Sequence, residues 1–145
     1  MKSLFINRES ICMADDVEDH LAKIIVSDTC SYLGLLEEVK RAKYLPSYDT
    51  MWLLCSENSG FIAAYYNYST YSHIIWQSDI NENKEIGDNE SFYFDCELFR
   101  QEMWKHKEDY EKLICRVKSK YNISDELFKQ IEEYLHKVRS SSNGK

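Results

Sequence analysis

The sequence predicts a single α+β domain in which a small antiparallel sheet of about four strands is flanked by N-terminal helices and a C-terminal helical hairpin. The middle of the chain holds short apolar and aromatic runs separated by polar turns, which is typical of strands. The segments on either side carry apolar residues at spacings of three and four, which is typical of helices. A length of 145 residues suits one domain, so we expect residues 1–139 to form it and 140–145 to be a flexible tail.

The N-terminal third is expected to be mainly helical after a short strand or ordered arm at residues 3–7. Asp15 or Asp16 can cap a first helix. Its apolar face would hold Val17, Leu21, Ile24 and Ile25. Asp28 or Thr29 can cap a second helix over about 30–44, which ends before Pro46. Its face would hold Tyr32, Leu35, Leu36 and Val39.

Four strands are expected in the middle of the chain. Residues 51–55, 61–68 and 71–78 are apolar runs separated by turn signals, which predicts an antiparallel meander. Residues 91–96 alternate Phe92, Phe94 and Cys96 with Tyr93 and Asp95, and this period of two predicts a fourth strand.

The last third is expected to form two helices joined by a short turn. The first, over about 97–120, carries one continuous stripe made of Phe99, Met103, His106, Tyr110, Leu113, Val117 and Tyr121. Ser124 can cap the second helix, with Asp125 and Glu126 in its first turn. The short connection between the helices predicts an antiparallel hairpin.

Acidic residues are concentrated in the segment 79–97. The net charge is −7, and this segment holds seven acidic residues against Lys84 alone. Clustered lysines and arginines are what nonspecific nucleic-acid binding requires, so we expect no nucleic-acid partner. An acidic surface instead favours a basic protein partner, although acidic loops can also serve solubility alone. We expect no membrane span and a cytoplasmic location, because the chain has no run of eighteen apolar residues and its start lacks the long apolar region of a secretory signal.

The residue types that carry catalysis are present but form no recognised motif. The five cysteines lack the C-x-x-C spacing of metal or redox sites, so we expect reduced, packed thiols and no metal or other cofactor. Glu102 and His106 are four residues apart and could meet on a helix, but His106 lies in the apolar stripe. We therefore expect no catalytic residue and a protein that is not an enzyme.

The stretch 63–77 is unusually rich in aromatic residues with polar tips. Neither face of the expected strand 61–68 is plainly polar. Either both faces are covered, or one aromatic face is exposed for a partner. The rings could equally stabilise the sheet by cross-strand pairing. Stacking on nucleic-acid bases is disfavoured, because the neighbouring loop is acidic and not basic.

An acidic single domain with aromatic strands and no catalytic motif resembles bacterial immunity proteins, including those of contact-dependent growth inhibition systems. The resemblance implies a protein that binds a basic toxin domain, such as a nuclease, and blocks its active site. Carboxylates would then take the place of substrate phosphates while aromatic rings anchor the interface. Candidate partner-binding residues are Tyr66, Tyr68, Tyr71, His73, Asp79, Glu82, Glu85 and Asp88. The alternatives are a small cytosolic enzyme that uses His73 or His106, and a phage or regulatory protein that mimics nucleic acid.

Overall fold

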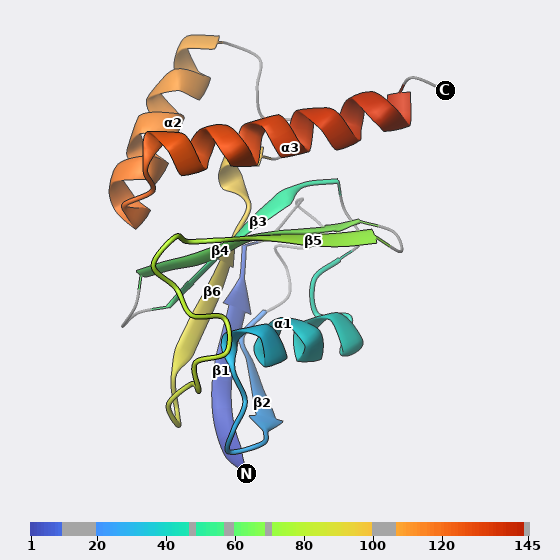
Figure 1. The fold of residues 1–145 in the computed structure, drawn as a ribbon, viewed down its shortest axis with the longest axis vertical. Helices are drawn as coiled ribbons and strands as arrows, with labels where there is room; N and C mark the ends of the chain where they lie inside the picture. The colour runs from blue at the N-terminus through green and yellow to red at the C-terminus, as the bar shows by residue number, and fades with distance from the viewer. Residues whose placement is uncertain (10–19, 47–48, 57–59, 69–70, 100–106, 144–145) are drawn as a thin grey trace.

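The computed structural model describes residues 1–9, 20–46, 49–56, 60–68, 71–99 and 107–143. Its elements follow one another in the order shown in Figure 1: β1 (Lys2–Arg8), β2 (Ala22–Val26), α1 (Tyr32–Arg41), β3 (Met51–Ser56), β4 (Gly60–Tyr68), β5 (Tyr71–Trp76), β6 (Ser91–Asp95), the 3₁₀ helix η2 (Glu97–Phe99), α2 (Lys107–Tyr121) and α3 (Asp125–Asn143). No helix in these ranges is long and apolar enough to span a membrane.

The strands form one mixed sheet in the order β2-β1-β6-β3-β4-β5. All neighbours are antiparallel except β1 and β6, which run parallel from Phe5 opposite Ser91 to Arg8 opposite Phe94. The predicted meander of β3, β4 and β5 is confirmed, and so is the strand at 91–95. The predicted four-stranded antiparallel sheet is wrong. Strand β1 pairs with β6, and β2 pairs with the other edge of β1, which gives a mixed sheet of six strands.

The predicted N-terminal pair of helices is also wrong, because residues 22–26 form strand β2. This strand pairs with β1 from Lys2 opposite Val26 to Ile6 opposite Ala22. Its sequence AKIIV is rich in β-branched residues, which fit a pleated sheet better than a helix. The expected caps Asp15 and Asp16 lie outside the described residues.

Helix α1 is the predicted second helix, and its expected face is confirmed. Tyr32, Leu35, Leu36 and Val39 are all buried. The cap is Ser31, not Asp28 or Thr29: its hydroxyl oxygen accepts a hydrogen bond from the amide of Gly34 at 3.2 Å. The helix ends at Arg41, well before Pro46, and Lys43 takes the left-handed conformation that commonly follows a helix (φ 53°).

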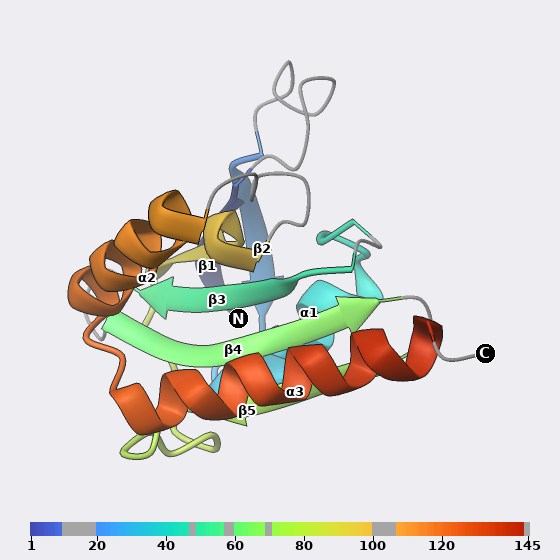
Figure 2. The same ribbon diagram turned by 90° about the horizontal axis from the view of Figure 1, so that it is seen from above.

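Helices cover both faces of the sheet, so the protein has two cores. Helix α1 packs on one face, and α2 and α3 lie across the other (Figures 1 and 2). Alternate residues of β3 point to opposite cores: Trp52 and Leu54 to the α1 side, Met51 and Leu53 to the other. Every residue of β3 is buried. Both faces of β3 and β4 are therefore covered in their middle, which explains why the aromatic stretch shows no polar face.

The C-terminal helices follow the predicted pattern from Lys107 onward, whereas residues 97–99, the expected start of the first helix, form the 3₁₀ helix η2. The hydroxyl oxygen of Ser124 accepts a hydrogen bond from the amide of Leu127 at 3.1 Å, which confirms the predicted cap. Leu113 and Val117 of the predicted stripe are buried. Met103 and His106 lie outside the described residues, and the described helix begins at Lys107.

Candidate interaction surface

The segment between β5 and β6, residues 77–90, is here called the acidic loop. Asp79, Glu85 and Asp88 are exposed, and Glu82 and Glu90 are half-buried. The two remaining carboxylates of the acidic segment lie elsewhere: Asp95 is buried at the end of β6, and Glu97 belongs to η2. The loop therefore presents four of the predicted partner-binding residues on one connected stretch of backbone.

Main-chain hydrogen bonds fix the acidic loop against the start of α1. The amide of Ile86 donates to the carbonyl of Cys30 at 2.9 Å, and the amide of Leu33 donates to the carbonyl of Glu82 at 3.1 Å. Ile86 itself is only 2% exposed and belongs to the α1 core. The loop is thus anchored by a buried side chain at its centre.

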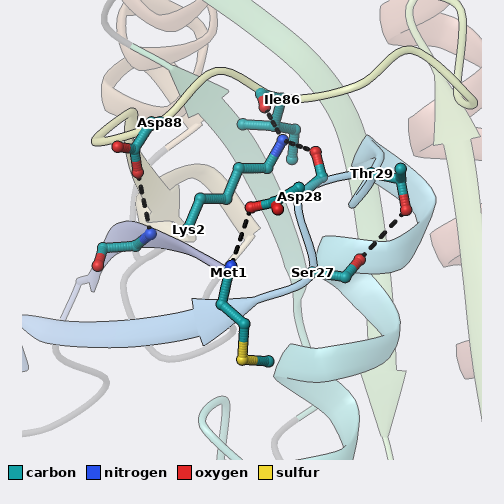
Figure 3. Close-up of polar contacts among 8 residues, drawn as sticks. Met1, Lys2, Ser27, Asp28, Thr29, Ile86 and Asp88 are labelled. Atoms are coloured by element: carbon teal, nitrogen blue, oxygen red, sulfur yellow. Dashed lines mark hydrogen bonds and ion pairs between the residues drawn. The ribbon is translucent and has the colours of Figure 1, made fainter.

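The N-terminal strand holds the second half of the loop (Figure 3). The ammonium of Lys2 donates to the carbonyls of Ile86 and, at 2.7 Å, Asp28. The amide of Ser3 donates to the carboxylate of Asp88 at 3.1 Å, and the amide of Asn89 donates back to the carbonyl of Ser3 at 2.9 Å. These bonds hold the loop, while the carboxylates of Asp79 and Glu85 remain exposed.

The exposed charge of the loop is not neutralised internally. Across the described part of the chain, Asp79, Glu82 and Glu85 form no ion pair with a lysine, arginine or histidine. Asp88 is bonded to a neutral amide, which leaves its charge in place. The loop is therefore a negatively charged surface whose backbone is fixed by hydrogen bonds.

Tyr66, one of the predicted contact residues, is part of the core. It is 4% exposed, and its hydroxyl donates to Asp49 Oδ1 at 3.0 Å. Burial, reinforced by this carboxylate, raises the pKa of Tyr66 above its usual value. Arg139 of α3 completes the group through Asp49 Oδ1 at 3.3 Å and the Asp49 carbonyl at 2.7 Å. These contacts tie the end of α3 to the start of β3, so Tyr66 has a structural role.

The remaining aromatic candidates lie near the tip of the β4–β5 hairpin. Tyr68 is 40% exposed. His73 is exposed, and its ring stacks on Tyr134 of α3 with centroids 4.2 Å apart. The side chain of Tyr71 lies outside the described residues. The acidic loop leaves the opposite end of β5 (Figure 2), so the structure does not bring the predicted aromatic and acidic groups together.

A cluster of three carboxylate side chains, which the sequence did not predict, lies where β1 and β6 end. Oxygen atoms of Glu9, Asp95 and Glu97 lie within 4.8 Å of one another. Such oxygens suit a divalent cation, yet each has a protein partner. Glu9 accepts from the Cys96 thiol at 3.4 Å, Asp95 from the Tyr121 hydroxyl, and Glu97 pairs with Arg116 at 3.0 Å. No sequence signal joins these residues, because Glu9 and Asp95 meet only through the parallel pairing of β1 with β6.

Comparison with known proteins gave no relative: no family model, no curated protein and no solved structure matched this chain.

Proposed function

We propose that this chain is a non-enzymatic binding protein that recognises a basic protein partner through its acidic loop, as an immunity protein recognises a toxin domain. The observation that carries the proposal is the combination of fixed backbone and free charge. Asp79 and Glu85 are exposed and Glu82 is half-buried, on a loop whose main chain is bonded to α1 and β1.

Fixing the loop in advance favours binding, because association then orders fewer groups and loses less conformational entropy. The negative field of the loop would also steer a positively charged partner and raise its association rate. A partner that itself binds phosphates, such as a nuclease toxin domain, would offer a basic site that these carboxylates can fill.

Two buried cysteines are poorly suited to act as nucleophiles. Cys30, Cys55, Cys96 and Cys115 are all free thiols, as a reducing compartment requires. Burial raises the pKa of the Cys55 thiol, and burial likewise raises that of Cys30. Both thiols therefore stay protonated at neutral pH, whereas a cysteine nucleophile needs the thiolate.

Charge reversal tests the proposal. The partner is first captured from host cells with the wild-type chain as bait, and its association is then measured by surface plasmon resonance at low and high salt. Asp79→Lys with Glu85→Lys should lower the association rate and flatten its dependence on salt. The matched control is Glu111→Lys with Glu133→Lys, two exposed positions on α2 and α3 with the same change of charge. Equal rates for the two double variants at low salt would refute the acidic loop as the binding surface.

A further inference from the structure

The sheet ends in two edge strands that differ in charge. In the order β2-β1-β6-β3-β4-β5, β2 and β5 each have one side without a neighbour among the described strands. Strand β2 (AKIIV) carries the exposed Lys23, and a lysine on an edge strand opposes pairing with another chain. Strand β5 (YSHIIW) contains no lysine, arginine, carboxylate or proline. The β5 edge therefore lacks the usual protection against pairing with a further strand.

The hydrogen bonds to β4 show which main-chain groups of β5 are free. The amide of Gln77 donates to the carbonyl of Ile62 at 2.9 Å, so the main-chain groups of Gln77 point to β4. This direction alternates along a strand, and the register of β4 with β5 is unbroken, so those of Ile75 also point to β4. The residues whose main-chain groups point to the open side are Ser72, Ile74 and Trp76.

The side chains at the same three positions form a surface that is only partly covered. Ile74 and Trp76 pack against the α1 core but are half-buried, and Ser72 is half-buried beside them. Tyr65 and Ala63, which lie opposite Ile74 and Trp76 on β4, are at most 2% exposed. In Figure 1, β5 lies between α1 and α3. An added strand would therefore complete the main-chain hydrogen bonds of β5 and cover apolar surface at the same time.

The β5 edge is complementary to itself under a two-fold rotation. When a second copy lies antiparallel with Ile74 opposite Ile74, Ser72 of each copy lies opposite Trp76 of the other. All three outward-facing positions then meet outward-facing positions, and each such pair exchanges two main-chain hydrogen bonds. A shift of the register by one residue would lose this match.

Charge at the two ends of β5 is also complementary. Near the start of the strand, the ammonium of Lys40 on α1 donates to the hydroxyl oxygen of Ser72 at 3.1 Å, and it forms no ion pair within the described ranges. The exposed Asp79 of the acidic loop follows three residues after Trp76, the end of the strand. Antiparallel pairing places the start of one strand beside the end of the other. Each end of the pairing would therefore bring Lys40 of one copy towards Asp79 of the other.

We infer that the edge of β5 binds a second copy of this chain, which gives a two-fold symmetric dimer with one continuous sheet. Both ends of that sheet are β2, where Lys23 opposes the addition of a further strand. A closed dimer is therefore favoured over an open chain of copies. The inference goes beyond the proposed function and does not depend on it, because Glu82 and Glu85 of the acidic loop take no part in the pairing.

Two measurements on the wild-type protein test the pairing. Sedimentation velocity between about 10 µM and about 1 mM should show conversion from the mass of one chain to the mass of two. Hydrogen exchange followed by nuclear magnetic resonance should show the amides of Ile74 and Trp76 becoming protected as the dimer forms. The amide of Ile75, which points to β4, should be protected at every concentration. A monomer over the whole range would overturn the inference, and so would a dimer in which Ile74 and Trp76 stay unprotected.

A lysine placed on either edge completes the test. Ile74→Lys puts two lysines opposite one another at the two-fold axis and should weaken dimerisation about ten-fold or more. Ile25→Lys is the matched control, because it makes the same change at an exposed position of β2, and it should leave dimerisation unchanged. Circular dichroism checks that both variants are folded, and if Ile74→Lys is not, the exchange pattern of the wild type decides. A loss in Ile25→Lys as large as in Ile74→Lys would refute the β5 interface, and growth of the wild type into larger assemblies would refute the closed dimer.

Discussion

The hydroxyl of Tyr121, the last residue of α2, donates a hydrogen bond to the carboxylate of Asp95 at the end of β6. Asp95 is 4% exposed, and its other oxygen accepts from the amide of Glu97 at 2.9 Å. This bond fixes the end of α2 on the sheet. A charge this deeply buried depends on its hydrogen-bond donors.

Removing the Tyr121 hydroxyl should destabilise the fold. Tyr121→Phe keeps the ring but leaves one oxygen of Asp95 without its donor, which should lower the free energy of unfolding by about 1–3 kcal/mol. Urea denaturation followed by circular dichroism measures this change. Tyr93→Phe is the matched control, because the structure gives its hydroxyl no hydrogen-bond partner among the described residues, and it should stay within about 0.5 kcal/mol of wild type. A loss no larger in Tyr121→Phe than in the control would contradict the role of this bond.

The buried stripe of α2 should hold the second core together. Leu113 is 6% exposed and packs with Val117 and Ile131. Leu113→Ala should cost about 2–5 kcal/mol, because it leaves a cavity between α2 and α3. Lys112 is exposed one residue away, and Lys112→Ala should lie within about 0.5 kcal/mol of neutral in the same denaturation experiment. Equal losses would mean that the helix presents a different face to the sheet.

Alkaline pH should destabilise the protein. Burial, with the neighbouring Glu132 carboxylate, raises the pKa of Tyr110 from 10.0 to about 12. The stabilisation is complete below the unfolded pKa and is lost as pH rises towards the folded one, since the unfolded chain then releases its proton first. The free energy of unfolding should therefore fall between about pH 10 and pH 12, and fall less steeply in Tyr110→Phe. Denaturation curves across this range measure both slopes, and a flat profile in wild type would refute the assignment.

Thiol reactivity should divide the described cysteines into two classes. Cys115 is exposed on α2, whereas Cys55 and Cys96 are buried. A thiol reagent added to the native protein should modify Cys115 quickly and the buried pair only as fast as the fold opens. Mass spectrometry of digested samples locates the label, and Cys115→Ser should remove its share of the fast reaction. Rapid labelling of Cys55 would be inconsistent with its burial.

The acidic loop should loosen when Lys2 is changed. Lys2→Met removes the ammonium that bonds the carbonyls of Ile86 and Asp28, while retaining an apolar chain of similar length. The amides of Ile86 and Asn89 should then exchange with solvent faster, whereas amides in β3 and β4 should not change. Hydrogen exchange measured by nuclear magnetic resonance reports each site. Unchanged protection at Ile86 would mean that the core contact of its side chain holds the loop without help from β1.

Local patterns were sufficient to predict most elements, but not how they assemble. Alternation in residues 91–96 and the apolar runs 51–55 and 61–68 are short-range signals, and all three predicted strands correctly. Residues 17–26 satisfy a helical pattern, yet Ile24, Ile25 and Val26 form a strand because β1 offers a partner twenty residues away. The pairing of β1 with β6 joins residues over eighty positions apart and leaves no trace in the local sequence.

The candidate surface was also only partly predictable, because some of its features depend on local sequence and others on the tertiary structure. The high density of acidic residues identifies the acidic loop from the sequence alone. Asp79, Glu85 and Asp88 are exposed, as is expected in a polar segment between strands. Tyr66 and Tyr68 look alike in the sequence, but one is buried against Asp49 and the other is exposed at the hairpin tip.

The parallel pairing of β1 and β6 also sets an order of events during synthesis. The first strand leaves the ribosome long before residues 91–95, so until then it can pair with β2 but not take its place beside β6. The β3–β4–β5 meander, made of neighbours in sequence, can form in the interval. Completion of the sheet thus waits for β6, and the hydrogen bonds that fix the acidic loop to Ser3 and Phe5 cannot form until the chain has grown past residue 90.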